Sequence, residues 1–167
     1  MVLGMSIQTF TMLHVAISLV AIGTGLIVVW GMLAGNRSDG WTGMFLVTTV
    51  LTSVTGFMFP VPISLLLPSQ IFGFISLGVL APTILALYVF NLASIWRWVY
   101  IGGALLALYL NVFVAVVQAF QKIPFLQPLA PTQAELPFLV AQAVLFVLFC
   151  ALGAIAVMRF RPEPLEA

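Results

Sequence analysis

The chain has 167 residues, of which 63% are hydrophobic and 5% are charged, and its net charge is +1. A soluble domain carries about 25% charged residues, so this chain has too few to cover a water-facing surface. The small net charge also excludes the strongly basic surface that nucleic-acid binding requires. The composition therefore predicts one all-α domain embedded in a lipid bilayer, with no nucleic-acid partner.

Five apolar stretches are long enough to cross a bilayer, because about 20 helical residues at roughly 1.5 Å each span its hydrocarbon core. Polar turns, prolines and glycines separate these stretches. The pattern predicts a polytopic bundle over residues 1–167, with helices at about 12–34, 41–59, 70–92, 95–120 and 137–158 and a polar tail at 159–167.

Local signals set the limits of the first two predicted helices. Gly35 suits the C-terminal cap of the first helix, and Asp39 suits the positive N-terminal dipole of the second. Pro60 ends the second helix, and the apolar connection 61–69 is expected to dip into the membrane interface.

The later helices carry signals of the same kind. Pro82 removes a backbone hydrogen bond in the middle of the third helix and is expected to kink it near Gly78. Ser94 is expected to cap the fourth helix. Thr132 and Glu135 match the capping-box spacing and predict a short turn before the fifth helix.

The fourth helix carries two further features. Trp96, Trp98 and Tyr100 near its start predict an aromatic belt at the membrane interface. Small residues and one amide recur at every fourth position and predict a face that packs on a neighbouring helix. These residues are Gly103, Ala107, Asn111, Ala115 and Ala119.

The positive charges predict the orientation. An odd number of spans places the two termini on opposite sides of the membrane, and the side that holds the first, third and C-terminal connections carries all the arginines. The other side carries only Lys122. Positive charge favours the cytoplasmic side, so the N-terminus is predicted outside and the C-terminus in the cytoplasm.

Polar residues gather in the outer half of this predicted bundle, where every helix contributes at least one. Polar groups are costly in hydrocarbon and usually face the bundle interior, so they are candidates for a ligand-binding site. The candidates are His14, Thr52, Thr55, Gln70, Asn111, Gln118 and Gln142. One interpretation is a shallow outer-leaflet pocket for the head group of a quinone, a lipid or a haem. The other, which the sequence favours, is that these groups hold the helices together by hydrogen bonds.

The sequence gives little indication of a cofactor, a metal site or catalysis. His14 is the only histidine, so a haem would need a second ligand such as Met58, and apolar chains also use methionine as filler. No cofactor or metal site is therefore predicted. The sequence shows no nucleophile–base pair, paired carboxylates or phosphate loop, so the chain is predicted not to be an enzyme.

The second helix is rich in threonine and serine hydroxyls. They would suit the lining of a path for a solute. More often, such hydroxyls bond to a carbonyl oxygen of the preceding helical turn, and this is the favoured interpretation.

Parts of the sequence resemble small uncharacterised integral membrane proteins of proteobacteria. The resemblance lies in ALYLNVFV at 107–114, VQAF at 117–120 and LAPTQ at 129–133, and the segment 48–60 is similar too. That family has no established activity, so the resemblance implies a location in the bacterial inner membrane. It also implies a histidine in relatives near the position of Gln70, whose absence here weakens a two-histidine cofactor site.

Three functions follow from these patterns. The leading prediction is a non-enzymatic accessory or structural subunit of a larger inner-membrane complex, in contact with lipid and with other membrane subunits or copies of itself. The alternative is a binder of a small lipophilic ligand around His14. A passive channel or transporter lined by hydroxyls of the second helix is the third.

Overall fold

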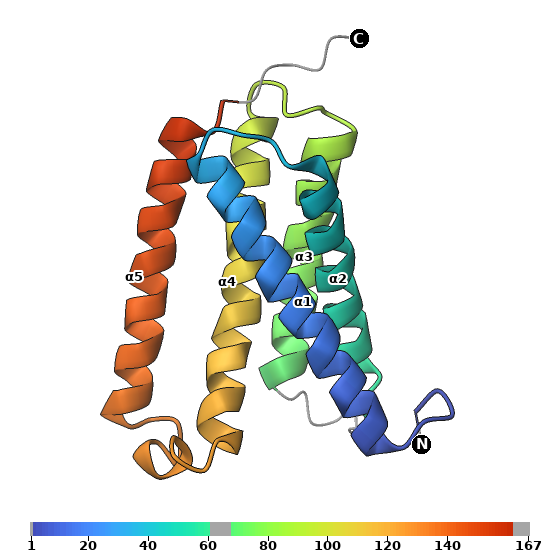
Figure 1. The fold of residues 1–167 in the computed structure, drawn as a ribbon, viewed down its shortest axis with the longest axis vertical. Helices are drawn as coiled ribbons and strands as arrows, with labels where there is room; N and C mark the ends of the chain where they lie inside the picture. The colour runs from blue at the N-terminus through green and yellow to red at the C-terminus, as the bar shows by residue number, and fades with distance from the viewer. Residues whose placement is uncertain (1, 61–67, 162–167) are drawn as a thin grey trace.

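The computed structural model describes residues 2–60 and 68–161, and these form an all-α bundle (Figure 1). The predicted connection 61–69 falls mostly outside the described residues. The five predicted helices are present. They are α1 (Ile7–Leu33), α2 (Asp39–Phe57), α3 (Pro68–Tyr88), α4 (Trp96–Lys122) and α5 (Leu136–Arg159), with a short 3-10 turn η1 (Gln127–Leu129) before α5.

The helices alternate in direction, so the start of α1 and the end of α5 lie at opposite ends of the bundle (Figure 1). We call these the lower end and the upper end, as drawn in Figure 1. α1 crosses the bundle obliquely and packs mainly on α2, while α3 packs mainly on α4. α5 lies at the edge, against α4 and α1.

Four helices are long and apolar enough to cross a membrane: α1, the 70–88 part of α3, α4 and α5. The fifth long helix, α2, has 19 residues and lies alongside them, and its many hydroxyl side chains make it more polar. Many large apolar side chains of the bundle are exposed on its outer surface. The described residues therefore form a helical bundle of membrane type.

The turn between α1 and α2 forms as predicted. Gly35 has a φ of +77°, its N–H donates to the Met32 carbonyl at 3.1 Å, and the Asn36 N–H donates to the Gly31 carbonyl at 2.8 Å. This is a glycine-based C-terminal cap. α2 begins at Asp39, two residues before the predicted start, so the Asp39 carboxylate lies in the first turn, where the helix dipole favours it.

The turn between α3 and α4 differs from the prediction. α3 ends at Tyr88, and Asn91, Leu92 and Ser94 all adopt positive φ values of 45°, 58° and 47°. α4 begins at Trp96, so Ser94 is not its cap, and the prediction was wrong. A left-handed Ser94 cannot take the extended geometry in which an N-cap side chain reaches the helix N–H groups.

The predicted aromatic belt is only partly present. Trp98 is exposed, with the Arg97 guanidinium 4.6 Å from its ring centre, and Trp96 stacks on Phe90 at 3.8 Å. Tyr100 is 2% exposed and lies 3.3 Å from the Thr42 hydroxyl, so it belongs to the core. Burial is favourable here because the phenol hydroxyl finds a polar partner.

The predicted small-residue face of α4 packs closely on α3 at Gly103, whereas its lower members Asn111, Ala115 and Ala119 line a cavity between the helices. A Cβ added to Gly103 would lie 1.9 Å from Thr83 Oγ1, so only glycine permits this approach. The Thr83 hydroxyl donates to the Val79 carbonyl at 2.6 Å, one residue after the carbonyl that Pro82 leaves free. α3 continues through Pro82.

The upper half of the bundle is filled with buried apolar side chains. They come from all five long helices and include Val28, Phe45, Leu80, Leu108 and Phe149. Gly25 lets α1 approach closely, because a Cβ at this position would lie 2.7 Å from Leu108 and 2.8 Å from Phe45. These side chains fill the space between the helices in the upper half, whereas the lower half contains a cavity.

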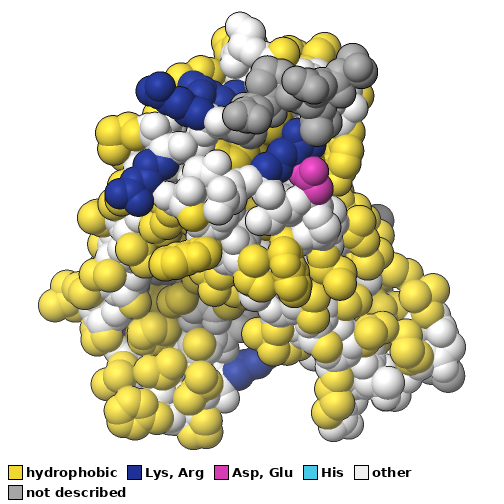
Figure 2. Space-filling view, turned by 45° about the horizontal axis from the view of Figure 1, so that its top comes forward, with side chains coloured by type: hydrophobic (Ala, Val, Ile, Leu, Met, Phe, Trp, Pro, Cys, Tyr) yellow, Lys and Arg dark blue, Asp and Glu magenta, His cyan; other side chains and the backbone are white. Residues whose placement is uncertain are grey.

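Lysine and arginine side chains gather at the upper end of the bundle (Figure 2). Arg37, Arg97, Arg159 and Arg161 belong to the connections and helix ends located there, whereas Lys122 ends α4 at the lower end. The Arg159 side chain also donates to the Leu33 carbonyl at 3.3 Å and ties α5 to the end of α1.

Candidate functional site

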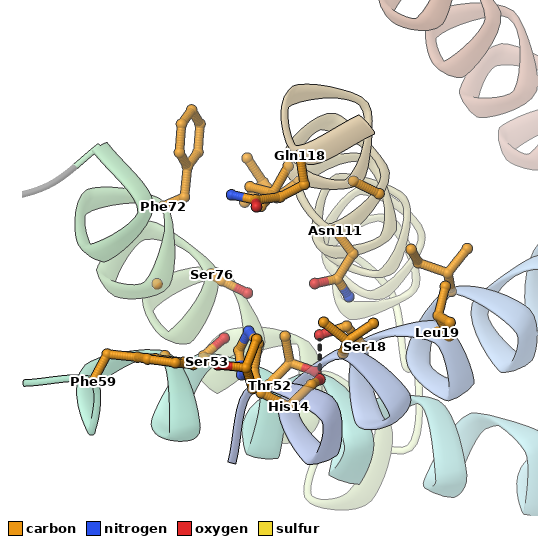
Figure 3. Close-up of a pocket in the computed structure, with 18 of the residues that line it drawn as sticks. His14, Ser18, Leu19, Thr52, Ser53, Phe59, Phe72, Ser76, Asn111 and Gln118 are labelled. Carbon is orange, nitrogen blue, oxygen red and sulfur yellow. Dashed lines mark hydrogen bonds between the residues drawn. The ribbon is translucent and has the colours of Figure 1, made fainter. Parts of the chain in front are cut away.

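A cavity of about 550 Å³ lies between α1, α2, α3 and α4 in the lower half of the bundle (Figure 3). This volume is within the range of ligand pockets, roughly 300–1,000 Å³. Its lining combines apolar side chains with polar groups from all four helices. The predicted candidates that line it are His14, Thr52, Gln70, Asn111 and Gln118.

The other two predicted residues do not line the cavity. Thr55 lies behind His14, and its Oγ1 is 2.7 Å from His14 Nδ1, so it supports the cavity wall. Gln142 lies on α5 and donates to the Phe113 carbonyl at 3.3 Å, which joins α5 to α4. Its place outside the cavity reflects the peripheral position of α5.

The structure adds polar lining residues that the sequence analysis did not select. Three of them, Thr11, Ser18 and Lys122, lie one helical turn from selected residues, and that spacing was the signal available for finding them. Thr11 and Ser18 flank His14 on α1, Ser76 follows Gln70 on α3, and Lys122 follows Gln118 on α4. Ser53 lies next to Thr52 on α2.

His14 is held by contacts on two sides. Besides the Thr55 hydroxyl, the Phe59 ring meets the imidazole edge to face, with ring centres 5.4 Å apart and planes at 90°. Gly56 of α2 also lies beside the imidazole, and a Cβ there would make an ordinary contact of 3.8 Å with His14 Cε1. These contacts fix the orientation of the ring at the cavity wall.

Two buried polar side chains of α3 lack hydrogen-bond partners among the described residues. Gln70 is 9% exposed and Ser76 is 4% exposed, and neither Gln70 Oε1 nor Ser76 Oγ has a partner. Buried polar groups are nearly always paired, because an unpaired one costs about 1–3 kcal/mol. Both residues line the cavity, so their free hydrogen-bonding capacity is available to an occupant.

Asn111 projects from α4 into the same space. Its Nδ2 donates to Thr49 Oγ1 at 3.3 Å and so links α4 to α2. In Figure 3 the side-chain oxygen of Asn111 points toward Ser76 across the cavity. Asn111 thus acts in helix packing and also presents an acceptor to the cavity.

The hydroxyls of α2 bond to its own backbone, as the favoured interpretation predicted. Thr48 donates to the Met44 carbonyl at 2.7 Å, Thr52 to the Thr48 carbonyl at 2.9 Å, and Ser53 to the Thr49 carbonyl at 3.1 Å. Above the cavity, the buried side chains of the upper half close the bundle. The site is a cavity with one closed end.

The cavity opens through the side of the bundle, between α1 and α4. Val15 and Leu19 of α1 line it and are also 43% and 62% exposed, so they form its rim. Lys122 lines its lower part and is exposed. Figure 2 shows a hollow in the lower half of this face with a basic side chain inside it.

The described residues contain no group of three or more His, Cys, Asp and Glu side chains that would hold a metal ion. Met58, the candidate second haem ligand, is not among the residues that line the cavity. Cys150 is exposed on α5, away from this site.

No protein-family model, curated protein or solved structure matches the chain. The resemblance to proteobacterial membrane proteins therefore stays a prediction. Fold and site together define a helical bundle of membrane type with a largely apolar cavity that carries several polar groups and opens to the side of the bundle.

Proposed function

We propose that the protein is a non-enzymatic, multi-pass protein of the bacterial inner membrane that binds a small amphipathic ligand in the cavity between α1, α2, α3 and α4. The observation that carries this proposal is the pair of buried, unpaired side chains Gln70 and Ser76 on the cavity wall. A ligand with a polar head group would satisfy them, and the apolar lining would hold the rest of the molecule.

All five helices cross the bilayer in this proposal, and the arginine-rich upper end faces the cytoplasm. The cavity then opens to the outer leaflet. A lipophilic ligand would reach it from the bilayer, through the rim formed by Val15 and Leu19.

Helix–helix hydrogen bonding explains only part of the polar cluster. The pairs His14–Thr55 and Asn111–Thr49 do hold helices together. Gln70 and Ser76 make no such bond within the described chain, so helix packing gives no reason for their presence. Water molecules would also satisfy them, so the test must detect the ligand itself.

The test is native mass spectrometry of the protein extracted gently from its own membrane. We expect the 18.1 kDa polypeptide to carry additional small-molecule mass. The double variant Gln70→Leu with Ser76→Ala should lose that mass. Thr24→Val is the matched control, because the buried Thr24 hydroxyl bonds the Val20 carbonyl at 2.7 Å and lies outside the cavity. A wild-type protein that carries no extra mass contradicts the proposal.

The accessory-subunit function is the second candidate, and α5 is the observation that favours it. This helix packs mainly on α4 and α1 and leaves large apolar side chains uncovered. These include Leu139, Val140, Val144, Phe146, Val147 and Leu148. Lipid contact requires the same composition, so the ligand-binding proposal ranks first. Other polypeptides in the same mass spectrum would support the subunit function.

A further inference from the structure

The contacts of the Thr55 hydroxyl favour one tautomer of the His14 imidazole. Thr55 Oγ1 lies 2.7 Å from the Leu51 carbonyl oxygen and 3.2 Å from the Thr52 carbonyl oxygen. Carbonyl oxygens only accept, so the single hydroxyl proton goes to this pair. With the hydroxyl proton assigned to these carbonyls, the hydroxyl oxygen, 2.7 Å from His14 Nδ1, accepts a hydrogen bond from an Nδ1–H group.

A neutral imidazole with its proton on Nδ1 has a bare Nε2, which is an acceptor. Thr55 fixes the ring from the α2 side, and the ring belongs to the cavity lining. His14 therefore offers the cavity a fixed acceptor. The partner that suits it is a hydrogen-bond donor.

The unpaired polar groups of Gln70 and Ser76 also suit a ligand that donates hydrogen bonds. Gln70 Oε1 is an acceptor without a partner in the described chain, and Ser76 Oγ can accept or donate. A carboxylate or phosphate would place acceptor against acceptor at His14 and Gln70. Among the described residues that line the cavity, only Lys122 is charged, and it lies at the lower edge, four residues beyond Gln118.

We infer that the occupant of the cavity is a neutral amphiphile with hydroxyl groups, which donates a hydrogen bond to His14 Nε2 and a second one to Gln70 Oε1. This inference rests on the proposed ligand-binding function. Hydroquinones with an alkyl tail and aliphatic diols with an alkyl tail both have this chemistry. The corresponding quinones and methyl ethers have similar size and apolar surface but donate nothing.

The test is a native-mass-spectrometry titration of the full-length protein in lipid nanodiscs, under anaerobic conditions, with matched probes. The probes are a decyl hydroquinone, its quinone, its dimethyl ether, a decyl 1,2-diol and the dimethyl ether of that diol. We expect at least one of the two hydroxylated probes to bind about tenfold or more tightly than its own dimethyl ether. If that probe is the hydroquinone, it should also bind about tenfold or more tightly than its quinone. Tenfold is on the order of one net hydrogen bond.

Two variants connect this preference to His14. His14→Phe keeps an aromatic ring but removes the acceptor, and Thr55→Val releases the tautomer while it leaves the lining side chains in place. Both should reduce the preference for the hydroxylated probe to about threefold or less, and Thr24→Val should retain it. Either variant suffices if the other fails to fold.

The outcomes separate the two proposals. Equal binding of a diol and its ether, tighter binding of the quinone, or a preference that survives both variants would overturn the present inference and leave the ligand-binding function standing. If no probe binds and the protein from its own membrane carries no extra mass, both proposals fail.

Discussion

His14 Nδ1 and Thr55 Oγ1 lie 2.7 Å apart and join α1 to α2 at the wall of the cavity. The two residues are 41 positions apart in the sequence, so this bond is a tertiary contact that both holds the helices and orients a cavity side chain. Thr55→Val keeps the shape of the side chain and removes the hydroxyl. We expect it to destabilise the bundle by about 0.6–2 kcal/mol.

Unfolding in detergent, by SDS titration or steric trapping, measures this effect. Thr48→Val is the control, because the Thr48 hydroxyl bonds only carbonyls of its own helix, at 2.7 Å and 3.2 Å. An equal loss of stability in both variants would show that the contact between α1 and α2 contributes nothing of its own.

The contact between Gly103 and Thr83 predicts that α4 tolerates no side chain at this position. In Gly103→Ala the new methyl group would overlap Thr83 Oγ1, so α3 and α4 must move apart, at a cost of about 1–3 kcal/mol. Gly102→Ala is a close control, since a Cβ at Gly102 meets nothing within 4 Å. Thr83→Ala should restore part of the stability of Gly103→Ala, and no restoration would argue against this contact.

Ser76 has no partner among the described residues, and this predicts an unusual effect on stability. Removing a buried hydroxyl that makes no hydrogen bond relieves its desolvation, so Ser76→Ala should stabilise the ligand-free protein by up to about 1 kcal/mol. Ser53→Ala removes a cavity hydroxyl that bonds the Thr49 carbonyl at 3.1 Å and should not stabilise. Thermal unfolding of delipidated protein tests both. A destabilised Ser76→Ala would mean that the hydroxyl is already satisfied.

Glu135 predicts a pH-dependent turn at the start of α5. Its carboxylate accepts hydrogen bonds from the Thr132 hydroxyl at 2.8 Å and the Ala134 N–H at 3.1 Å. Desolvation raises the pKa of the carboxyl, but the hydrogen bonds outweigh it and hold the pKa below its ordinary value of 4.5. The turn is therefore stabilised above that value and loses this stabilisation as the pH falls through the lower, folded-state pKa.

An NMR titration of the Thr132 amide resonance follows this turn. Its midpoint should lie below pH 4.5, and Thr132→Val should move the midpoint upward because a donor is lost. A midpoint at or above 4.5 in the wild type would contradict the assigned hydrogen bonds.

The proposed orientation can be measured with single cysteines. In a Cys150→Ala background, Gln127→Cys lies at the lower end and Ser38→Cys at the upper end. A thiol reagent that does not cross membranes should label Gln127→Cys in intact spheroplasts and reach Ser38→Cys only after lysis. The reverse pattern would invert the topology and place the opening of the cavity in the cytoplasmic leaflet.

Helix number and most helix ends could be predicted from the sequence, because apolar length and local caps depend on neighbouring residues alone. Gly35 is such a case. The left-handed turn at Asn91, Leu92 and Ser94 is different, since none of these residues is a glycine and only the surrounding structure imposes this conformation. The side toward which Tyr100 points also depends on how α4 packs.

The candidate site was also predictable only in part. The residues His14, Gln70 and Asn111 were found because polar side chains are rare in apolar helices. Which of these side chains find a hydrogen-bond partner could not be predicted, because that depends on the rotation and separation of the helices. The sequence pattern places Gln142 at the same predicted depth as the other candidates, and the docking of α5 places it outside the cavity.

The contrast between a filled upper half and an open lower half has a kinetic consequence. A molecule that passes between Val15 of α1 and Ala119 of α4 would disturb only the lower turns of these helices, while the side chains around Phe45 and Leu108 stay in contact. The residence time of an occupant should then respond to side-chain size at the rim, and substitutions deep in the upper half should change the lifetime of the folded protein instead.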